Sequence, residues 1–388
     1  MWTKIVRVLL FVCLIPAFAA TQAAYTVTDL GSLSPTAINT LAQVVGNYNN
    51  QAYIWAFGRV RSLGTLSGGT ISTAAAINDH GVVTGTADGA GTIVSTVSGF
   101  PNAQCSDLTQ PFIWTEENGM QGLGTISVGG EFIDVLELYC FLPFEASGIN
   151  ARGQVVGNTF GFGSSYQWGF LWTSADGMTS FGGSYEPTFV NGISNKGQIV
   201  GQNSEGPDTS YSTSWKNGVA TDLGALGGSV DSVSSSSLAN GVNERGQIVG
   251  WSTVNAISLG ACYEFFDPSN CIIHAVLWTP SGVISDLGTL PGDQSSSALK
   301  VNLFGQVIGS SGNTVTFQQP SPQVIGRPFV WSQANGMQDL NTLIPPNSGW
   351  VLNLATDINA WGQIVGSGTF NGQPHGFLLT PRNPFQLN

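Results

Sequence analysis

The sequence is poor in charged residues: Asp, Glu, Lys and Arg make up 9% of the chain, with 11 Lys and Arg against 23 Asp and Glu. The net charge of −12 argues against a nucleic-acid partner, because phosphates select surfaces rich in Lys and Arg. It also disfavours binding to anionic membrane surfaces. Low charge, 51 glycines and many β-branched residues together favour short strands and tight turns over helices.

The sequence also lacks the short motifs of several common enzyme classes. It contains no Gly-x-x-x-x-Gly-Lys phosphate loop, no Gly-x-Ser-x-Gly nucleophile elbow and no His-Glu-x-x-His metal motif. The three histidines, His80, His274 and His375, lie far apart along the chain. The sequence therefore indicates no catalytic residue, no metal site and no cofactor.

The first residues have the pattern of a secretory signal peptide. Lys4 and Arg7 give a positive start, residues 9–18 are apolar, and small residues up to Ala23 suit cleavage by signal peptidase. No later stretch approaches the apolar length needed to span a bilayer. We therefore assign residues 1–23 to a signal peptide and residues 24–388 to one domain, and we expect a secreted or periplasmic monomer.

One phrase recurs seven times: Ile-Asn, two variable residues, Gly, then Gln-Val-Val-Gly or a close relative, as in residues 149–157 and 358–366. Asn suits the first position of a type I turn and Gly suits the left-handed position that follows, so each phrase predicts a tight hairpin. Ser194 replaces Asn in the fourth copy. The other six copies have Asn at Asn39, Asn78, Asn150, Asn243, Asn302 and Asn359.

Two further phrases recur at the same spacing. One ends in Trp in six of its seven copies, as in Ala275-Val276-Leu277-Trp278, and the other resembles Asp-Leu-Gly-Thr-Leu. With the two strands of the hairpin they make four short strands in each unit of roughly 40 to 60 residues, which is the pattern of a propeller blade. The strand before Ile-Asn is rich in small residues, which suits an innermost strand crowded near the axis.

The first and last parts of the mature chain together make one complete repeat unit. Residues 25–31 form an Asp-Leu-Gly strand without the rest of its unit, and the last unit, which ends near Pro381, lacks that strand. An open solenoid would instead need atypical caps at both ends. The sequence therefore predicts an all-β, seven-bladed β-propeller with four short antiparallel strands per blade, whose N-terminal strand closes the last blade.

With these repeats the chain resembles the extracellular repeat family called HAF, named for a His-Ala-Phe phrase before Leu-Trp. Residues 274–278 (His-Ala-Val-Leu-Trp) and 375–378 (His-Gly-Phe-Leu) match it, as do the Asp-Leu-Gly-Thr-Leu copies. The resemblance covers essentially all of the mature chain and implies bacterial export. It implies no established activity, so no catalytic residue is carried over.

The links between strands fall into two groups. The Ile-Asn turn and the turn after the Trp strand are always short, whereas the other two kinds of link reach considerable length at residues 87–110, 127–145, 252–273 and 311–327. In an up-down-up-down blade the short turns lie on one face, here named the plain face, and the long links lie on the opposite, decorated face. Because binding residues concentrate on loops held by a rigid scaffold, the decorated face is the expected functional face.

The arrangement of the links selects one of the three possible pairings of the cysteines. Without Cys13 of the leader, four cysteines remain, and an even number in an exported chain suggests disulfides. Cys262 and Cys271 share one link, and Cys105 and Cys140 lie in two neighbouring links on the same face. We predict the pairs Cys105–Cys140 and Cys262–Cys271, which would staple long links.

The candidate ligand-binding residues lie in links of the decorated face. They are aromatic and acidic, and aromatic rings beside carboxylates suit stacking on a sugar or anchoring of a protein partner. The alternative for Phe265 and Phe266 is that they pack beneath their own loop. The candidates are Tyr263, Glu264, Phe265, Phe266, Asp267, Trp350, Tyr185 and Glu186.

Three functions remain open from the sequence. The leading hypothesis is a binding or interaction scaffold for an unknown protein or glycan. The second is a carbohydrate-active enzyme, a hydrolase or lyase, that uses loop carboxylates such as Glu131, Asp134 and Glu137. The third is a purely structural surface protein. The fold does not decide among them, since propellers host unrelated activities.

One pair of charged residues breaks the pattern of the inner strands. The residue before the inner Ile or Val is small in five copies, but it is Lys300 in the sixth and Asp357 in the seventh. Neighbouring blades would bring these two side chains close together near the axis. Because a lone buried charge is costly, we predict an ion pair between Lys300 and Asp357 that bridges the two blades.

Overall fold

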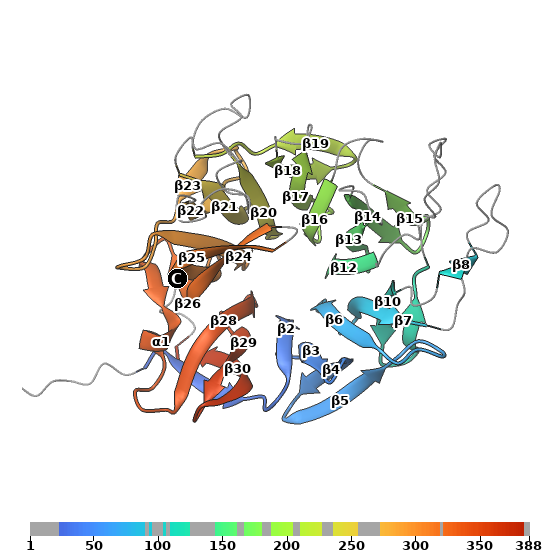
Figure 1. Ribbon diagram of the computed structural model, residues 1–388, viewed down its shortest axis with the longest axis horizontal. Coiled ribbons are helices and arrows are strands. Elements are labelled where there is room, and N and C mark those ends of the chain that lie inside the picture. The colour runs from blue at the N-terminus through green and yellow to red at the C-terminus, as the bar shows by residue number, and fades with distance from the viewer. Residues whose placement is uncertain are drawn as a thin grey trace, which may run out of the picture.

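The computed structural model describes residues 23–89, 93–94, 104–105, 109–124, 144–160, 167–180, 188–204, 210–226, 236–254, 272–318 and 321–383. Within these ranges the chain forms seven four-stranded antiparallel sheets that surround a common axis (Figure 1). The predicted seven-bladed β-propeller is confirmed. In each blade the innermost strand is the one that precedes the Ile-Asn turn.

The first three blades take up residues 34–180. Blade one consists of β2 (Ser34–Ile38), β3 (Val44–Tyr48), β4 (Gln51–Ala56) and β5 (Arg59–Gly64). Blade two consists of β6 (Ser72–Ile77), β7 (Val83–Asp88), β10 (Thr109–Thr115) and β11 (Gly119–Gly122), and a two-stranded sheet of β8 (Ile93–Val94) and β9 (Gln104–Cys105) lies within its long link. Blade three consists of β12 (Phe144–Ile149), β13 (Val155–Phe160), β14 (Gln167–Thr173) and β15 (Gly177–Ser180).

The next three blades repeat this order. Blade four consists of β16 (Thr188–Ile193), β17 (Ile199–Ser204), β18 (Ser210–Lys216) and β19 (Val219–Asp222). Blade five consists of β20 (Ser237–Val242), β21 (Ile248–Thr253), β22 (Ile273–Trp278) and β23 (Ile284–Asp286). Blade six consists of β24 (Ser295–Val301), β25 (Val307–Gln318), β26 (Ser321–Ser332) and β27 (Gly336–Asp339), and the one-turn helix α1 (Leu340–Leu343) follows it.

Blade seven joins the two ends of the chain. It consists of β28 (Trp350–Ile358), β29 (Ile364–Phe370), β30 (Gln373–Pro381) and, as its outer strand, β1 (Tyr25–Asp29). β1 pairs with β30 in antiparallel register from Tyr25↔Pro381 to Asp29↔Phe377. The predicted closure of the ring by the N-terminal strand is therefore confirmed.

The glycine that ends each Gln-Val-Val-Gly phrase leaves room for the innermost strand. In every blade a Cβ added at this glycine would collide with a backbone carbonyl oxygen of that strand, which carries a β-bulge at this level. In four blades a fully buried Phe of the third strand also covers the glycine: Phe112, Phe170, Phe329 and Phe377. The glycines are Gly46, Gly85, Gly157, Gly201, Gly250, Gly309 and Gly366.

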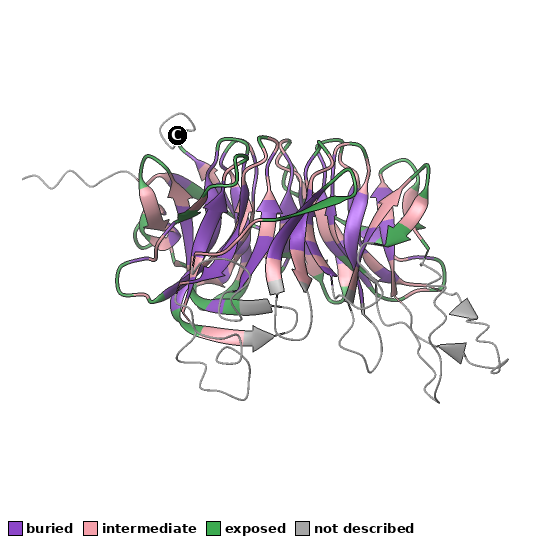
Figure 2. Cartoon of the chain, turned by 90° about the horizontal axis from the view of Figure 1, so that it is seen from above, coloured by how far each residue is buried: buried purple, intermediate pink, exposed green. Residues whose placement is uncertain are grey.

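The strands alternate in direction, so their links lie on two faces, as the sequence indicates. Figure 2 shows the buried middles of the strands between two exposed edges, with the C-terminal end of the chain on one of them. That edge is the plain face. β30 is the third strand of blade seven and ends at this edge, as do the third strands of the other six blades. The Ile-Asn turns, such as residues 39–43 between β2 and β3, lie on the same face.

The prediction of a long link at residues 311–327 of blade six is wrong. Most of these residues belong to the two strands β25 and β26. β25 and β26 pair from Val307↔Trp331 outward to Gln318↔Ser321, with one irregularity between Ser311 and Thr314. Thr314, Val315 and Thr316 are β-branched residues, which favour strand over loop. The decorated face of blade six therefore carries a long hairpin.

The Asn of each Ile-Asn turn also forms a ring of hydrogen bonds between blades. In Asn302, for example, Oδ1 accepts the backbone N–H groups of Phe304 and Gln306, and Nδ2 donates to the backbone carbonyl of Asn359 in the next blade at 3.1 Å. Six of the seven seams have this inter-blade bond, and the last of them runs from Asn359 back to Asn39 at 3.0 Å. Ser194 has no amide to donate, so the seam between blades four and five lacks the bond.

Small residues crowd the axis as predicted. A Cβ added at Gly148 would lie 3.6 Å from the Cα atom of Gly192, and one added at Gly192 would lie 3.9 Å from the Cα atom of Gly241. The inner strands of blades three, four and five thus approach through their backbones. Only residues with small side chains fit between strands at this distance.

The expected ion pair between Lys300 and Asp357 takes a different form. The Asp357 carboxylate accepts the backbone N–H groups of Ile38 in blade one and of Ile358, both at 2.9 Å. Burial raises the pKa of Asp357, and the charge of Lys300 and the two N–H groups offset part of that rise. Within the described ranges Lys300 makes no contact ion pair with Asp357, but its charge still acts on the carboxylate.

Several predictions concern residues that the structure does not describe. Residues 1–22 of the expected signal peptide lie outside the described ranges, as do Cys140, Cys262 and Cys271. Cys105 is described only as backbone, in β9. The pairs Cys105–Cys140 and Cys262–Cys271 therefore stay predictions. No helix among the described residues has the length and apolar character that crossing a membrane requires.

Candidate functional site

Most candidate ligand-binding residues lie outside the part of the chain that the structure describes. This holds for Tyr185 and Glu186 in the link after blade three and for Tyr263, Glu264, Phe265, Phe266 and Asp267 in the link of blade five. The carboxylates of the enzyme hypothesis, Glu131, Asp134 and Glu137, lie outside it as well. Trp350 is described, and the surroundings of Trp350 form the candidate site.

Trp350 is the centre of an aromatic cluster at the decorated end of blade seven. It begins β28, and its cross-strand partner Phe370 ends β29. The two rings are stacked, with centroids 5.2 Å apart and an interplanar angle of 27°. The edge of the Trp350 ring meets His375 and the fully buried Phe377, with centroids 6.2 Å apart in each case. Such pairs rigidify the end of the sheet.

An Asp of the closing strand binds the histidine of this cluster. His375 Nδ1 lies 2.8 Å from Asp29 Oδ1, and the same carboxylate oxygen accepts the backbone N–H of Gly31 at 2.8 Å. The side chains of His375 and Asp29 are 26% and 39% exposed, so both can still be reached by a ligand. The aromatic cluster comes from β28, β29 and β30, and its His375–Asp29 pair forms only when β1 closes the ring.

Blade five has the same His–Asp pair. His274 Nδ1 lies 2.9 Å from Asp286 Oδ2, and Asp286 Oδ1 accepts the backbone N–H of Gly288 at 2.7 Å. Burial raises the pKa of Asp286, but the hydrogen bonds from His274 and Gly288 outweigh burial, so the pKa lies below its ordinary value. In blade six an Arg takes the place of the His: Arg327 binds Asp339 at 3.2 Å and Asp293 at 2.9 Å.

In blades five and seven these pairs join two of the recurring phrases. The His of the His-Ala-Phe phrase lies near the start of the third strand, and the Asp of the Asp-Leu-Gly phrase ends the fourth strand beside it. The repeat pattern in the sequence did not indicate a partner for either His. The available signal was that both copies with His, at His274 and His375, belong to blades that also carry the Asp.

The described site combines aromatic surface with a polar edge. The Trp350 and Phe370 rings offer stacking surface, and the His375–Asp29 pair offers a polar edge. Arg327 brings the carboxylates of Asp293 and Asp339 together, but the guanidinium lies between them and neutralises them. Within the described ranges, no group of three or more His, Cys, Asp and Glu side chains could hold a metal ion.

Comparison with known proteins adds fold similarity alone. No protein-family model and no curated protein matches the chain. A streptogramin B lyase is 9% identical, with 92% of this chain and 98% of that chain covered and a TM-score of 0.48. An oligogalacturonate lyase in complex with manganese is 10% identical, with 92% and 91% covered and a TM-score of 0.49. The β-propeller domain of the Trilobed protease from Pyrococcus furiosus is 10% identical, with 90% and 95% covered and a TM-score of 0.48.

Proposed function

We propose that this protein is an exported HAF-type repeat propeller that binds its ligand through the decorated face. The observation that supports this most is the aromatic cluster of Trp350 and Phe370, with the His375–Asp29 pair at its edge. The signal-peptide pattern of residues 1–23 and the repeat phrases support export.

A glycan is the ligand class that this cluster fits best. The apolar C–H face of a sugar ring stacks on an aromatic side chain, and its hydroxyl groups need donors and acceptors at the rim of the stack. Trp350 is half-buried, so packing holds its ring while part of it stays in contact with solvent. His375 contacts the Trp350 ring and binds Asp29, so this pair supplies polar groups beside the stacking surface.

The proposal is tested by glycan-array binding of the mature protein and of its Trp350→Ala variant. We expect Trp350→Ala to weaken binding of the recognised glycan by about tenfold or more, because buried aromatic anchors dominate recognition energies. Trp361→Ala is the matched control, since it removes an exposed Trp from the plain face. Equal loss in both variants, or no glycan bound at all, would contradict the proposal. Release of soluble sugar products would instead favour the enzyme hypothesis.

A further inference from the structure

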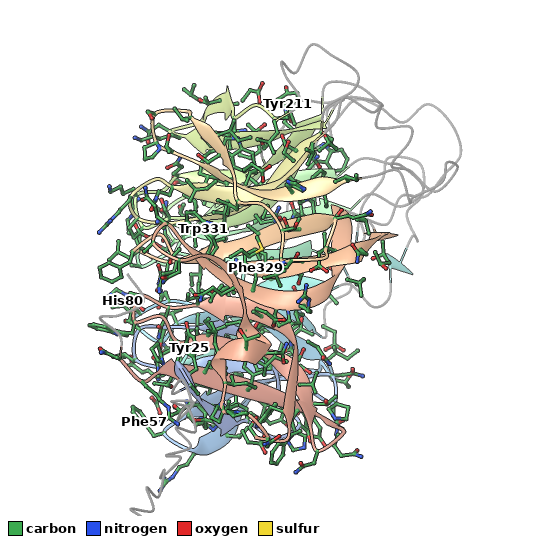
Figure 3. The ribbon with its side chains drawn as sticks, turned by 90° about the vertical axis from the view of Figure 1, so that its left-hand side faces the viewer. Tyr25, Phe57, His80, Tyr211, Phe329 and Trp331 are labelled. Atoms are coloured by element: carbon green, nitrogen blue, oxygen red, sulfur yellow. The ribbon has the colours of Figure 1, made fainter. Side chains whose placement is uncertain are left out.

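The plain face carries two kinds of side chain on its two halves. The position that differs is the second variable residue of the Asn-x-x-Gly turn, which is exposed in all seven blades. In blades two to five this residue is His80, Arg152, Lys196 or Arg245. In blades six, seven and one it is Phe304, Trp361 or Leu41. Four consecutive turns are thus basic or carry His, and the remaining three are apolar. Figure 3 labels His80, which lies on the plain face.

The apolar half, here called the apolar arc, is formed by the exposed side chains of Phe304, Trp361 and Leu41 in three neighbouring blades. Trp361 is 59% exposed, Leu41 58% and Phe304 47%. The indole N–H of Trp361 donates to the backbone carbonyl of Thr40 at 3.0 Å, so the ring is held at the seam between blades seven and one. Apolar side chains grouped on a surface in this way are typical of an interaction site.

The basic half, here called the basic arc, consists of the turns with His80, Arg152, Lys196 and Arg245. It concentrates Lys and Arg, which are scarce in this chain. Arg152, Lys196 and Arg245 are three of only 11 Lys and Arg. The two arcs meet where the guanidinium carbon of Arg245 lies 5.7 Å from the centre of the Phe304 ring. The acidic neighbour of Arg245 is engaged elsewhere, because the Glu244 carboxylate accepts the backbone N–H of Asn195 at 2.9 and 3.1 Å.

The opposite face has the opposite charge. Among the described residues, Arg327 is the only Lys or Arg at the decorated ends of the strands, whereas carboxylates recur there at Asp29, Asp88, Asp222, Asp286, Asp293 and Asp339. Strands of about 17–20 Å separate the two faces, which exceeds the screening length of about 8 Å at physiological salt. The net charge of −12 therefore does not describe the plain face.

We infer that the plain face docks a protein segment that carries carboxylates next to aromatic or aliphatic side chains. Carboxylates pair with the basic arc while apolar side chains cover Phe304, Trp361 and Leu41. A glycan would leave the aliphatic Leu41 unused, and a uniformly anionic membrane would meet the carboxylates of Asp79 and Glu244 on the same face. This surface is separate from the glycan site proposed on the decorated face.

The test is a selection from a phage library of random peptides, each roughly 12 residues long, on the immobilised mature protein. We expect the enriched sequences to combine Asp or Glu with Leu, Phe or Trp. Binding of an enriched peptide, measured by fluorescence anisotropy, should fall about tenfold or more in Arg152→Glu/Arg245→Glu and in Leu41→Ser/Trp361→Ser. The control is Phe57→Ser/Lys216→Ser, which removes one exposed apolar and one exposed basic residue at the outer rim of the same face and should bind unchanged.

Four outcomes would overturn the inference. The first is that no acidic, apolar peptide is enriched, and the second is that an enriched peptide binds both arc variants as well as the wild type. The third is that vesicles containing phosphatidylglycerol bind in a way that depends on both arcs while peptides do not. The fourth is that the wild type sediments as a dimer that both arc variants dissociate, which would make a second copy the partner. Thermal unfolding of each variant establishes that it is folded.

Discussion

At the scale of single residues, one type of side chain makes two kinds of hydrogen bond in six of the seven blades. The Asn of the Ile-Asn turn caps its own hairpin through Oδ1 and binds the next blade through Nδ2, as in Asn302. An amide has a separate acceptor oxygen and donor nitrogen, so Oδ1 and Nδ2 of Asn302 reach two different blades, whereas Ser has one hydroxyl and an ionised Asp only accepts. The Asn that local turn propensity favours is therefore also a residue that the ring requires.

The break at Ser194 leads to a prediction about stability. Ser194→Asn should add the missing bond to the backbone carbonyl of Asn243, and it should stabilise the protein by about 0.5–1.5 kcal/mol, the net value of a buried hydrogen bond. Asn302→Ser is the reverse change at a complete seam and should destabilise by a similar amount. Urea unfolding of both variants measures the two free energies. A Ser194→Asn variant that is less stable than the wild type would contradict this role of the ring.

At the scale of elements, each blade depends on a glycine in its second strand. A Cβ at Gly309 would collide with the carbonyl oxygen of Ser297 and would lie 2.8 Å from the ring of Phe329. The inner strand can therefore approach closely only because the side chain is missing, and Phe329 fills the space above it. This arrangement links the Gly of one phrase to the Phe of another.

The glycine leads to a second prediction. Gly309→Ala should destabilise the protein by about 1–3 kcal/mol, because an overpacked strand must shift or bend. Gly192→Ala is the control, since the nearest atom to its added Cβ lies at an ordinary 3.6 Å and its backbone needs no left-handed conformation. Chemical unfolding compares the two variants. Equal effects at the two positions would show that the collision at Gly309 is relieved by small adjustments.

At the scale of the whole molecule, stability depends on closing the ring. β1 pairs with the outer edge of β30, and its residue Tyr25 is completely buried. Near the axis, hydrogen bonds from Asn359 and Asp357 connect blade seven to blade one. Without β1, the edge of β30 would expose unpaired backbone groups, which promote aggregation. The His375–Asp29 pair of the candidate site would also be lost.

The closure gives a third prediction. A mature protein that starts at Gly31 should unfold at a clearly lower temperature and should aggregate, as followed by thermal unfolding and size-exclusion chromatography. Tyr25→Phe is the control, because the buried Tyr25 hydroxyl has no hydrogen-bond partner among the described residues, so its removal should cost little or even stabilise. A shortened protein with unchanged stability would show that the ring does not need its outer strand.

The sequence by itself determined the repeat, the four strands of each blade, the hairpin turns and the closure of the ring. These features follow from local rules, since the pattern of turn and strand residues recurs at a constant spacing. Only the tertiary structure decided which side chains meet between strands and blades: Asn302 with Asn359, His375 with Asp29, and the Asp357 carboxylate with the backbone of Ile38 instead of with Lys300. It also separated the basic turns from the acidic strand ends. Such contacts depend on distances between residues remote in sequence, which periodicity alone does not specify.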